Sequence, residues 1–148
     1  VLFSFSEFNL MPIGLGARDT LRLEMGFCLY GHELSEKISP LEAKLSKIVS
    51  FETKFIGSDS LKENKINKEL IAFELQERGI PRNGYDIVNE NDQKIGFVSS
   101  GTMSPSLNKG IGLGFLDVNS NFRDIFIVIR RKKMLAKIVK LPFYKKNN

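Results

Sequence analysis

The spacing of hydrophobic and polar positions along the chain changes near residue 65. Before this point, apolar side chains recur three or four positions apart, which is typical of helices. Residues 19–28 contain two pairs of apolar side chains at this spacing, Leu21 with Met25 and Leu23 with Phe27. The spacing predicts a short helix, with Asp19 favourable at its N-terminus and Arg18 just before it.

Two further helices are predicted in the same part of the chain. The run "SPLEAKLSKIV", residues 39–49, opens with the signals of a helix start, because Ser39 can cap it and Glu42 completes a reciprocal capping box. The run "GSDSLKEN", residues 57–64, predicts a shorter helix. A helical front segment is therefore expected before the pattern changes.

After residue 65, apolar and polar residues alternate over short runs that are separated by polar turns, which is the pattern of β-strands. Two strands joined by a polar turn are expected in 85–100, and one in each of the runs 68–77, 110–118, 124–131 and 134–143. Five or six strands without helices between them indicate an antiparallel barrel or a sandwich. The pattern thus predicts the α+β class in two parts, residues 1–65 and residues 66–148.

Charge is distributed unevenly along the chain. The formal net charge is +5, and residues 121–148 carry 9 Lys or Arg against 1 Asp or Glu. Such a basic segment attracts an acidic partner, which could be a nucleic acid, an acidic protein or a polyanionic small molecule. Phe143 and Tyr144 follow the charges instead of alternating with them, which weakens the nucleic-acid interpretation.

The composition indicates the cellular compartment in which the protein is expected. Its apolar runs fall short of the roughly 20 residues of a membrane span, and the apolar N-terminus has no basic region in front of it. A single cysteine allows no internal disulfide, which is typical of a reducing compartment. We therefore expect a cytoplasmic protein without a membrane partner. A chain that opens on "VLFSF" without Met is expected to continue a longer protein.

Several residue types that could do chemistry stand close together near the N-terminus. Gly14 and Gly16 begin a dinucleotide-binding pattern, but Asp19 stands where the third glycine belongs, so a structural turn is favoured. Zinc takes three or four protein ligands, and the chain offers one cysteine and one histidine, Cys28 and His32. No metal site is predicted, and Cys28 is expected to be a buried structural residue.

Two arginines at the edges of predicted elements are candidates for binding. Arg18 precedes the first helix, where a guanidinium can meet a carboxylate or a heteroaromatic acceptor. Arg82 lies in a turn before a strand, and loops held on a rigid scaffold often carry binding contacts. The pattern alone also allows the alternative that both arginines are solvent-exposed side chains without a binding role.

Residues 14–31, "GLGARDTLRLEMGFCLYG", closely resemble the aminomethyltransferases of the glycine cleavage system, the T-proteins. The family pattern in this stretch is G-L-G-A-R-D-[ST]-L-R-L-E-A-G-x-C-L-Y-G, and Met25 is the departure from it. The similarity continues through "ISPLEAKLSKIV", "ERGIPRNGYDI", "SSGTMSPSLNKGIGLGF" and "IRRKKMLAKIVKLPFY". It covers essentially the whole chain.

The resemblance implies a plan for the protein and a reaction. Residues 1–65 would be the end of the middle region around a folate-holding channel, and residues 66–148 a mostly antiparallel, distorted β-barrel. The implied reaction transfers an aminomethyl group from the lipoyl arm of the acidic H-protein to tetrahydrofolate, with release of ammonia. The catalytic Asp of the family lies in the N-terminal part, so this chain alone is expected to be inactive.

The resemblance also implies roles for single residues. Arg18 matches a substrate-binding arginine of the family and is expected to bind the folate, whereas Arg22 is expected to brace the fold. Arg82 matches an arginine that contacts the H-protein. The expected partners are lipoylated H-protein and tetrahydrofolate as co-substrate, with no metal. The alternative is a non-enzymatic basic module that binds nucleic acid or an acidic protein.

Overall fold

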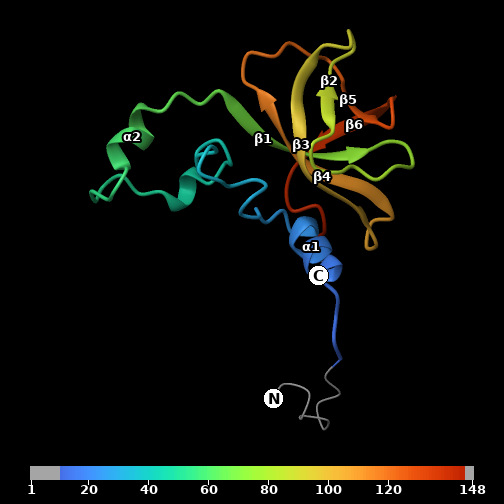
Figure 1. The fold of residues 1–148 in the computed structure, drawn as a ribbon, viewed down its shortest axis with the longest axis horizontal. Coiled ribbons are helices and arrows are strands. Elements are labelled where there is room, and N and C mark those ends of the chain that lie inside the picture. Colours follow the sequence, from blue (N-terminus) through green and yellow to red (C-terminus); the bar gives the residue numbers. More distant parts are fainter. Residues whose placement is uncertain (1–10, 146–148) are drawn as a thin grey trace.

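In the computed structural model, which describes residues 11–145, a largely irregular front segment leads into a closed barrel of six strands (Figure 1). The front segment contains α1 (Leu15–Glu24), the 3₁₀ turn η3 (Ser46–Ile48) and α2 (Ser58–Glu63), the last of which lies in the predicted run 57–64. The strands are β1 (Lys68–Leu75), β2 (Asp86–Val88), β3 (Lys94–Ser104), β4 (Lys109–Asp117), β5 (Ile125–Ile129) and β6 (Lys132–Val139). The α+β class is confirmed. Neither α-helix in this part of the chain is long and apolar enough to cross a membrane.

The strands run around the barrel in the order β1-β4-β3-β2-β5-β6, and every neighbouring pair is antiparallel. Closure comes from β1, in which Phe73 lies opposite Gly112 of β4 on one side and Ile138 of β6 on the other. Closure removes the exposed backbone edges that an open sheet would leave. Of the barrel and the sandwich that the pattern allowed, the barrel is therefore confirmed.

The first strand, β1, is apolar on both faces, and this determines where the front segment docks. Ile71, Phe73 and Leu75 pack into one core cluster, whereas Leu70 and Ala72 belong to a second. Alternate residues of a strand point to opposite faces, so the two clusters lie on the two sides of the barrel wall. The second cluster is completed by Leu23 of α1 and by Phe143. Full burial of a leucine such as Leu23 contributes about 1.5–3 kcal/mol.

Helix α1 begins at Leu15, four residues before the predicted start, so Arg18 and Asp19 lie inside it. The prediction that Arg18 precedes the helix was wrong. Gly14 is the N-cap with an extended backbone, and Gly16 sits in the first turn. A glycine inside a helix costs about 1 kcal/mol relative to alanine. A prediction from the sequence pattern therefore places the start of the helix after Gly16. Docking of Leu23 on the barrel offsets that cost.

Helix α1 ends at Glu24, earlier than the predicted end at residue 28. Gly26 has a φ of +74°, in the left-handed region that glycine adopts without a steric penalty. Its N–H donates to the carbonyl of Leu23 at 2.8 Å, and the N–H of Phe27 donates to the carbonyl of Arg22 at 2.9 Å. This pair of bonds is the Schellman motif, which satisfies the last carbonyls of a helix and turns the chain away.

The helix predicted for residues 39–49 does not form beyond its first turn. The reciprocal capping box is present, since the N–H of Ser39 donates to Glu42 Oε2 at 2.9 Å and the N–H of Glu42 donates to Ser39 Oγ at 3.3 Å. Lys44 then takes a left-handed φ of 58°, which interrupts the helix. The carbonyl of Glu42 instead accepts the N–H of Leu70 at 3.0 Å. Pairing with β1 thus overrides the local signal.

Glu24 ties the end of α1 to two other segments. Its buried carboxylate accepts the hydroxyl of Ser104, and both the N–H (3.2 Å) and the hydroxyl (2.9 Å) of Ser106. Its carbonyl accepts the N–H of Tyr144 at 3.0 Å. Burial raises the pKa of Glu24, but the hydrogen bonds from Ser104 and Ser106 outweigh it, so the pKa lies below its ordinary value of 4.5.

The variant Glu24→Gln is expected to lower the free energy of unfolding at pH 7 by about 1–3 kcal/mol, because the hydroxyl donors lose a charged acceptor. A carboxyl whose pKa is lowered by folding stabilises above its unfolded pKa, and this contribution is lost as pH falls through the folded pKa. The gap between wild type and variant should therefore close below pH 4.5. Urea unfolding at neutral and acidic pH measures it, and a gap independent of pH would contradict the assignment.

Candidate functional site

Arg18 lies in α1 and is exposed to solvent. Leu15, Leu21 and Met25 are spaced three or four residues apart with Arg18 along one side of the helix. Their exposed fractions are 83%, 66% and 43%, although they are apolar. An exposed apolar surface of this kind usually marks an interface or a binding site. The helix thus presents a guanidinium within an apolar surface that the described part of the chain does not cover.

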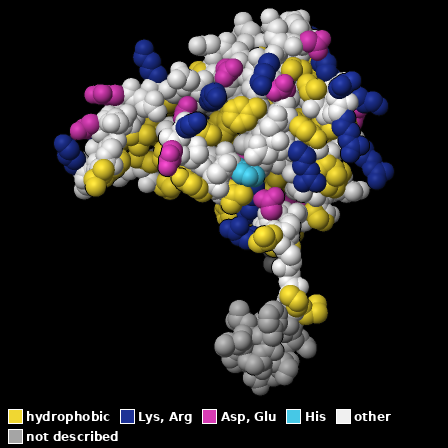
Figure 2. Space-filling view, viewed as in Figure 1, with side chains coloured by type: hydrophobic (Ala, Val, Ile, Leu, Met, Phe, Trp, Pro, Cys, Tyr) yellow, Lys and Arg dark blue, Asp and Glu magenta, His cyan; other side chains and the backbone are white. Residues whose placement is uncertain are grey.

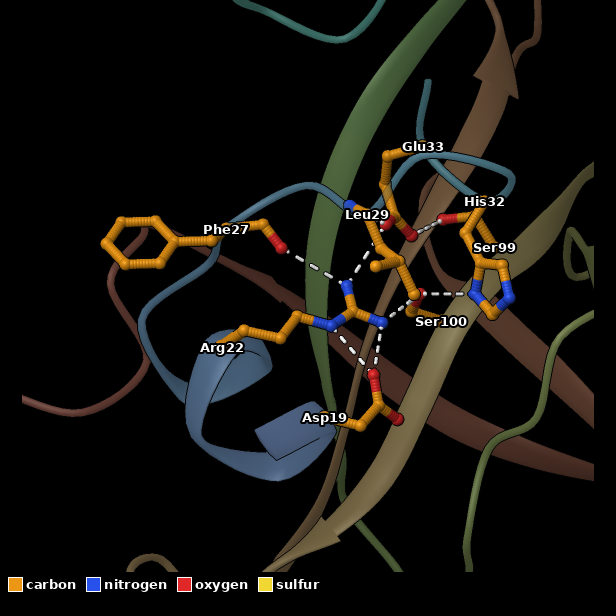
Figure 3. Close-up of polar contacts among 8 residues, drawn as sticks. All are labelled: Asp19, Arg22, Phe27, Leu29, His32, Glu33, Ser99 and Ser100. Atoms are coloured by element: carbon orange, nitrogen blue, oxygen red, sulfur yellow. Dashed lines mark hydrogen bonds and ion pairs between the residues drawn. The ribbon is translucent and has the colours of Figure 1, made fainter. Parts of the chain in front are cut away.

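The neighbouring arginine, Arg22, lies one helical turn after Arg18 and reaches the barrel (Figure 3). Its Nε donates to Asp19 Oδ1 at 2.8 Å, and its Nη2 lies 2.6 Å from the same oxygen. Its Nη1 donates to the carbonyl of Phe27 at 3.1 Å, and its Nη2 to Ser100 Oγ of β3 at 2.7 Å. One guanidinium therefore joins α1, the segment after it and the barrel wall.

Glu33 is the second carboxylate that pairs with Arg22, beside Asp19, and it is fully buried. Its Oε2 lies 3.1 Å from Arg22 Nη1 and accepts the N–H of Leu29 at 3.0 Å, while its Oε1 accepts the hydroxyl of Ser99 at 2.5 Å. No buried side-chain nitrogen or oxygen in residues 11–145 is left without a partner. A buried ion pair that is fully hydrogen-bonded holds its elements firmly, since breaking it leaves an uncompensated charge. The prediction that Arg22 braces the fold is confirmed.

Cys28 and His32 do not form a reactive pair. Helix α1 ends before both, so they are not one helical turn apart, and His32 Nδ1 contacts Ser100 Oγ at 3.1 Å. Burial and the charge of Glu33 raise the pKa of the Cys28 thiol, although Arg22 acts in the opposite direction. The thiol is therefore protonated at neutral pH, which suits neither a nucleophile nor a metal ligand. Across residues 11–145, no three His, Cys, Asp or Glu side chains are grouped to hold a metal ion.

Arg82 lies in the loop between β1 and β2. It is exposed, whereas the preceding Pro81 is buried. A side chain on Gly101 of β3 would collide with the backbone of Pro81, so the glycine lets the loop lie directly on the barrel. The carbonyl of Arg82 accepts the N–H of Tyr85 at 3.2 Å. Arg18 and Arg82 thus lie on different elements, α1 and the β1–β2 loop, and each of these elements rests on the barrel.

The structure also brings together cations that the sequence pattern did not group. A groove of about 800 Å³ is lined by five of them, and we name it the basic groove: Arg78, Arg82, Arg130, Lys132 and Lys133. The first two come from the β1–β2 loop, and the other three from the β5–β6 hairpin, far away in the sequence. The sequence did show the basic excess in residues 121–148. It could not show that these cations lie near Arg82, because that depends on the order of the strands around the barrel.

Comparison with known proteins identifies the same family along the chain. The model of the glycine cleavage T-protein C-terminal barrel domain matches residues 68–145, and that of the GCVT N-terminal domain matches residues 2–53. The aminomethyltransferase of Flavobacterium psychrophilum is 54% identical over 94% of this chain, and that of Phocaeicola vulgatus is 52% identical over 93%. The match covers 40% of each of these relatives.

A solved structure shows the same relation. The crystal structure of glycine cleavage system aminomethyltransferase T from Bartonella henselae matches 89% of this chain with a TM-score of 0.80 and 28% sequence identity. The match covers 39% of that protein. The chain therefore spans about two-fifths of the length of the relatives that it matches. By sequence and by fold, it belongs to the aminomethyltransferase (T-protein) family of the glycine cleavage system.

Proposed function

We propose that the chain is the C-terminal part of a tetrahydrofolate-dependent aminomethyltransferase. In this proposal, the whole enzyme takes the aminomethyl group from lipoylated H-protein, passes it to tetrahydrofolate and releases ammonia in the cytoplasm. Residues 1–65 complete the folate channel, and residues 66–148 are the C-terminal barrel domain. The observation that carries the proposal is Arg18, which stands in the family motif "GLGARD" on a helix that Arg22 and Glu33 lock to the barrel.

The surroundings of Arg18 are suited to a folate. Tetrahydrofolate has a polar heteroaromatic ring at one end and carboxylates at the other. A guanidinium can hold either a carboxylate or a ring acceptor by paired hydrogen bonds. The exposed side chains of Leu15, Leu21 and Met25 offer the apolar contact that the less polar middle of the ligand needs. Arg18 would thus bind and orient the co-substrate, while the reactive carboxylate comes from outside this chain.

In this proposal, Arg18 lies in this chain and the reactive carboxylate lies outside it. The isolated chain should therefore have no activity. A chimera that joins the preceding part of the Flavobacterium psychrophilum relative to this chain should release ammonia from aminomethyl-loaded H-protein when tetrahydrofolate is added. The complete relative is the positive control. Release of ammonia by the isolated chain, or a folded chimera that binds both substrates without turnover, would contradict the proposed division.

Arg18 and Arg22 form a matched pair of variants, because they are one helical turn apart and have different contacts. In the chimera, Arg18→Ala should raise the KM for tetrahydrofolate about ten- to a hundredfold, the effect of losing a charge-assisted bond. It should change the stability by less than about 0.5 kcal/mol. Arg22→Ala should lower the stability by about 3–5 kcal/mol, because Glu33 is left buried without its partner.

Steady-state kinetics and urea unfolding of both variants measure these effects. Arg18→Lys keeps the charge but loses the planar pair of donors, and should recover only part of the affinity. The role of Arg18 is contradicted if Arg18→Ala binds tetrahydrofolate as the unsubstituted chimera does.

A further inference from the structure

The β1–β2 loop, which carries Arg78 and Arg82 of the basic groove, rests on strands of the barrel. Gly79 packs against Met134 of β6, since a side chain added to it would meet the sulfur and the terminal methyl of that residue. A side chain on Gly110 of β4 would collide with the carbonyl of Gly79. The backbone next to Arg78 therefore rests on two strands of the barrel. This contact fixes the position of the β1–β2 loop relative to the β5–β6 hairpin.

The turn of the β5–β6 hairpin has a conformation that its sequence does not favour. Ile129 pairs with Lys132, so Arg130 and Arg131 form a two-residue turn, with φ of 48° and 67°. Such turns require positive φ at both central residues and strongly prefer Asn-Gly. Arginine is strained in both positions, and backbone strain of this kind is commonly kept at functional sites. The chain retains two cations at the point where an Asn-Gly pair would be more stable.

Most of the cations in the groove are not neutralised by the chain itself. In the described residues, no ion pair includes Arg78, Arg82, Arg130 or Lys132. Lys133 differs, since its ammonium lies 2.7 Å from Asp92 Oδ1 and 4.7 Å from the centroid of the Phe126 ring. Among the residues that line the groove, Glu77 is the one acid. Figure 2 shows Lys and Arg side chains gathered on this side of the barrel, near the β1–β2 loop and the β5–β6 turn.

We propose that the β5–β6 turn, through Arg130 and Arg131, is the second half of the surface that binds the acidic H-protein, with Arg82 in the first half. The inference rests on the proposed function, in which the H-protein is the partner, and on the expectation from the family resemblance that Arg82 contacts it. It adds that the turn extends the contact across the basic groove, and that its strain is retained because the positive charges attract the acidic face. Complementary charges of this kind speed association and give binding a salt dependence.

The double variant Arg130→Asn/Arg131→Gly separates binding from folding, because the new residues suit the turn. Its melting temperature should be equal to or above that of the wild type. Its dissociation constant for lipoylated H-protein should rise about tenfold at low salt, with a weaker salt dependence. The control Lys47→Ala/Lys65→Ala removes two exposed charges outside the groove and should bind as the wild type does.

Isothermal titration of the unsubstituted chain, the two double variants and Arg82→Ala with lipoylated H-protein distinguishes the outcomes. If Arg82→Ala weakens binding and the turn variant does not, the inference is overturned and the proposed function stands. If the unsubstituted chain and the chimera bind no H-protein, both are overturned. Equal loss of affinity in the control variant, or displacement of H-protein by a short single-stranded RNA that the turn variant no longer binds, would also overturn the inference.

Discussion

The ion pair between Arg22 and Glu33 is the interaction on which the arrangement of this chain depends. It joins α1, the segment that follows the helix, and the wall of the barrel at Ser99 and Ser100. Without Arg22, the carboxylate of Glu33 would stay buried with no cation beside it, and burying an unpaired ion costs several kcal/mol. The helix therefore has one well-defined position on the barrel, and the backbone that carries the exposed Arg18 has a fixed position as well.

Helix α1 has one set of side chains that docks on the barrel and another set that stays exposed. Leu23 and Glu24 fasten it to the barrel through an apolar cluster and a set of hydroxyl donors. Arg18 and Leu21 remain exposed on its other side. A helix of ten residues would be marginal in water by its own propensity, so docking provides most of its stability. The position of the exposed side chains therefore depends on the contacts of the buried ones.

The parts of the fold that follow from local pattern were predictable, and those that follow from long-range contacts were not. Short runs of apolar residues between polar turns identified the strands, although burial in β1 and β4 does not alternate because both faces of these strands are covered. The capping box at Ser39 led to the wrong prediction of a helix over residues 39–49. The carbonyl of Glu42 accepts a hydrogen bond from β1 instead of from the next helical turn. Arg22 was assigned a bracing role, but nothing near it in the sequence pointed to Ser100 and Glu33 as its partners. The basic groove likewise required the order of strands around the barrel, which the charge pattern does not contain.

A double-mutant cycle on Arg22 and Glu33 is the most direct test of this account. The single variants Arg22→Met and Glu33→Gln, and the double variant, are compared by urea unfolding of the chain. We expect strong coupling, with the double variant more stable than the sum of the single effects allows by at least about 1.5 kcal/mol, as found for close charge pairs. Additive effects within about 0.5 kcal/mol would contradict it, because the helix would then be held by its other contacts.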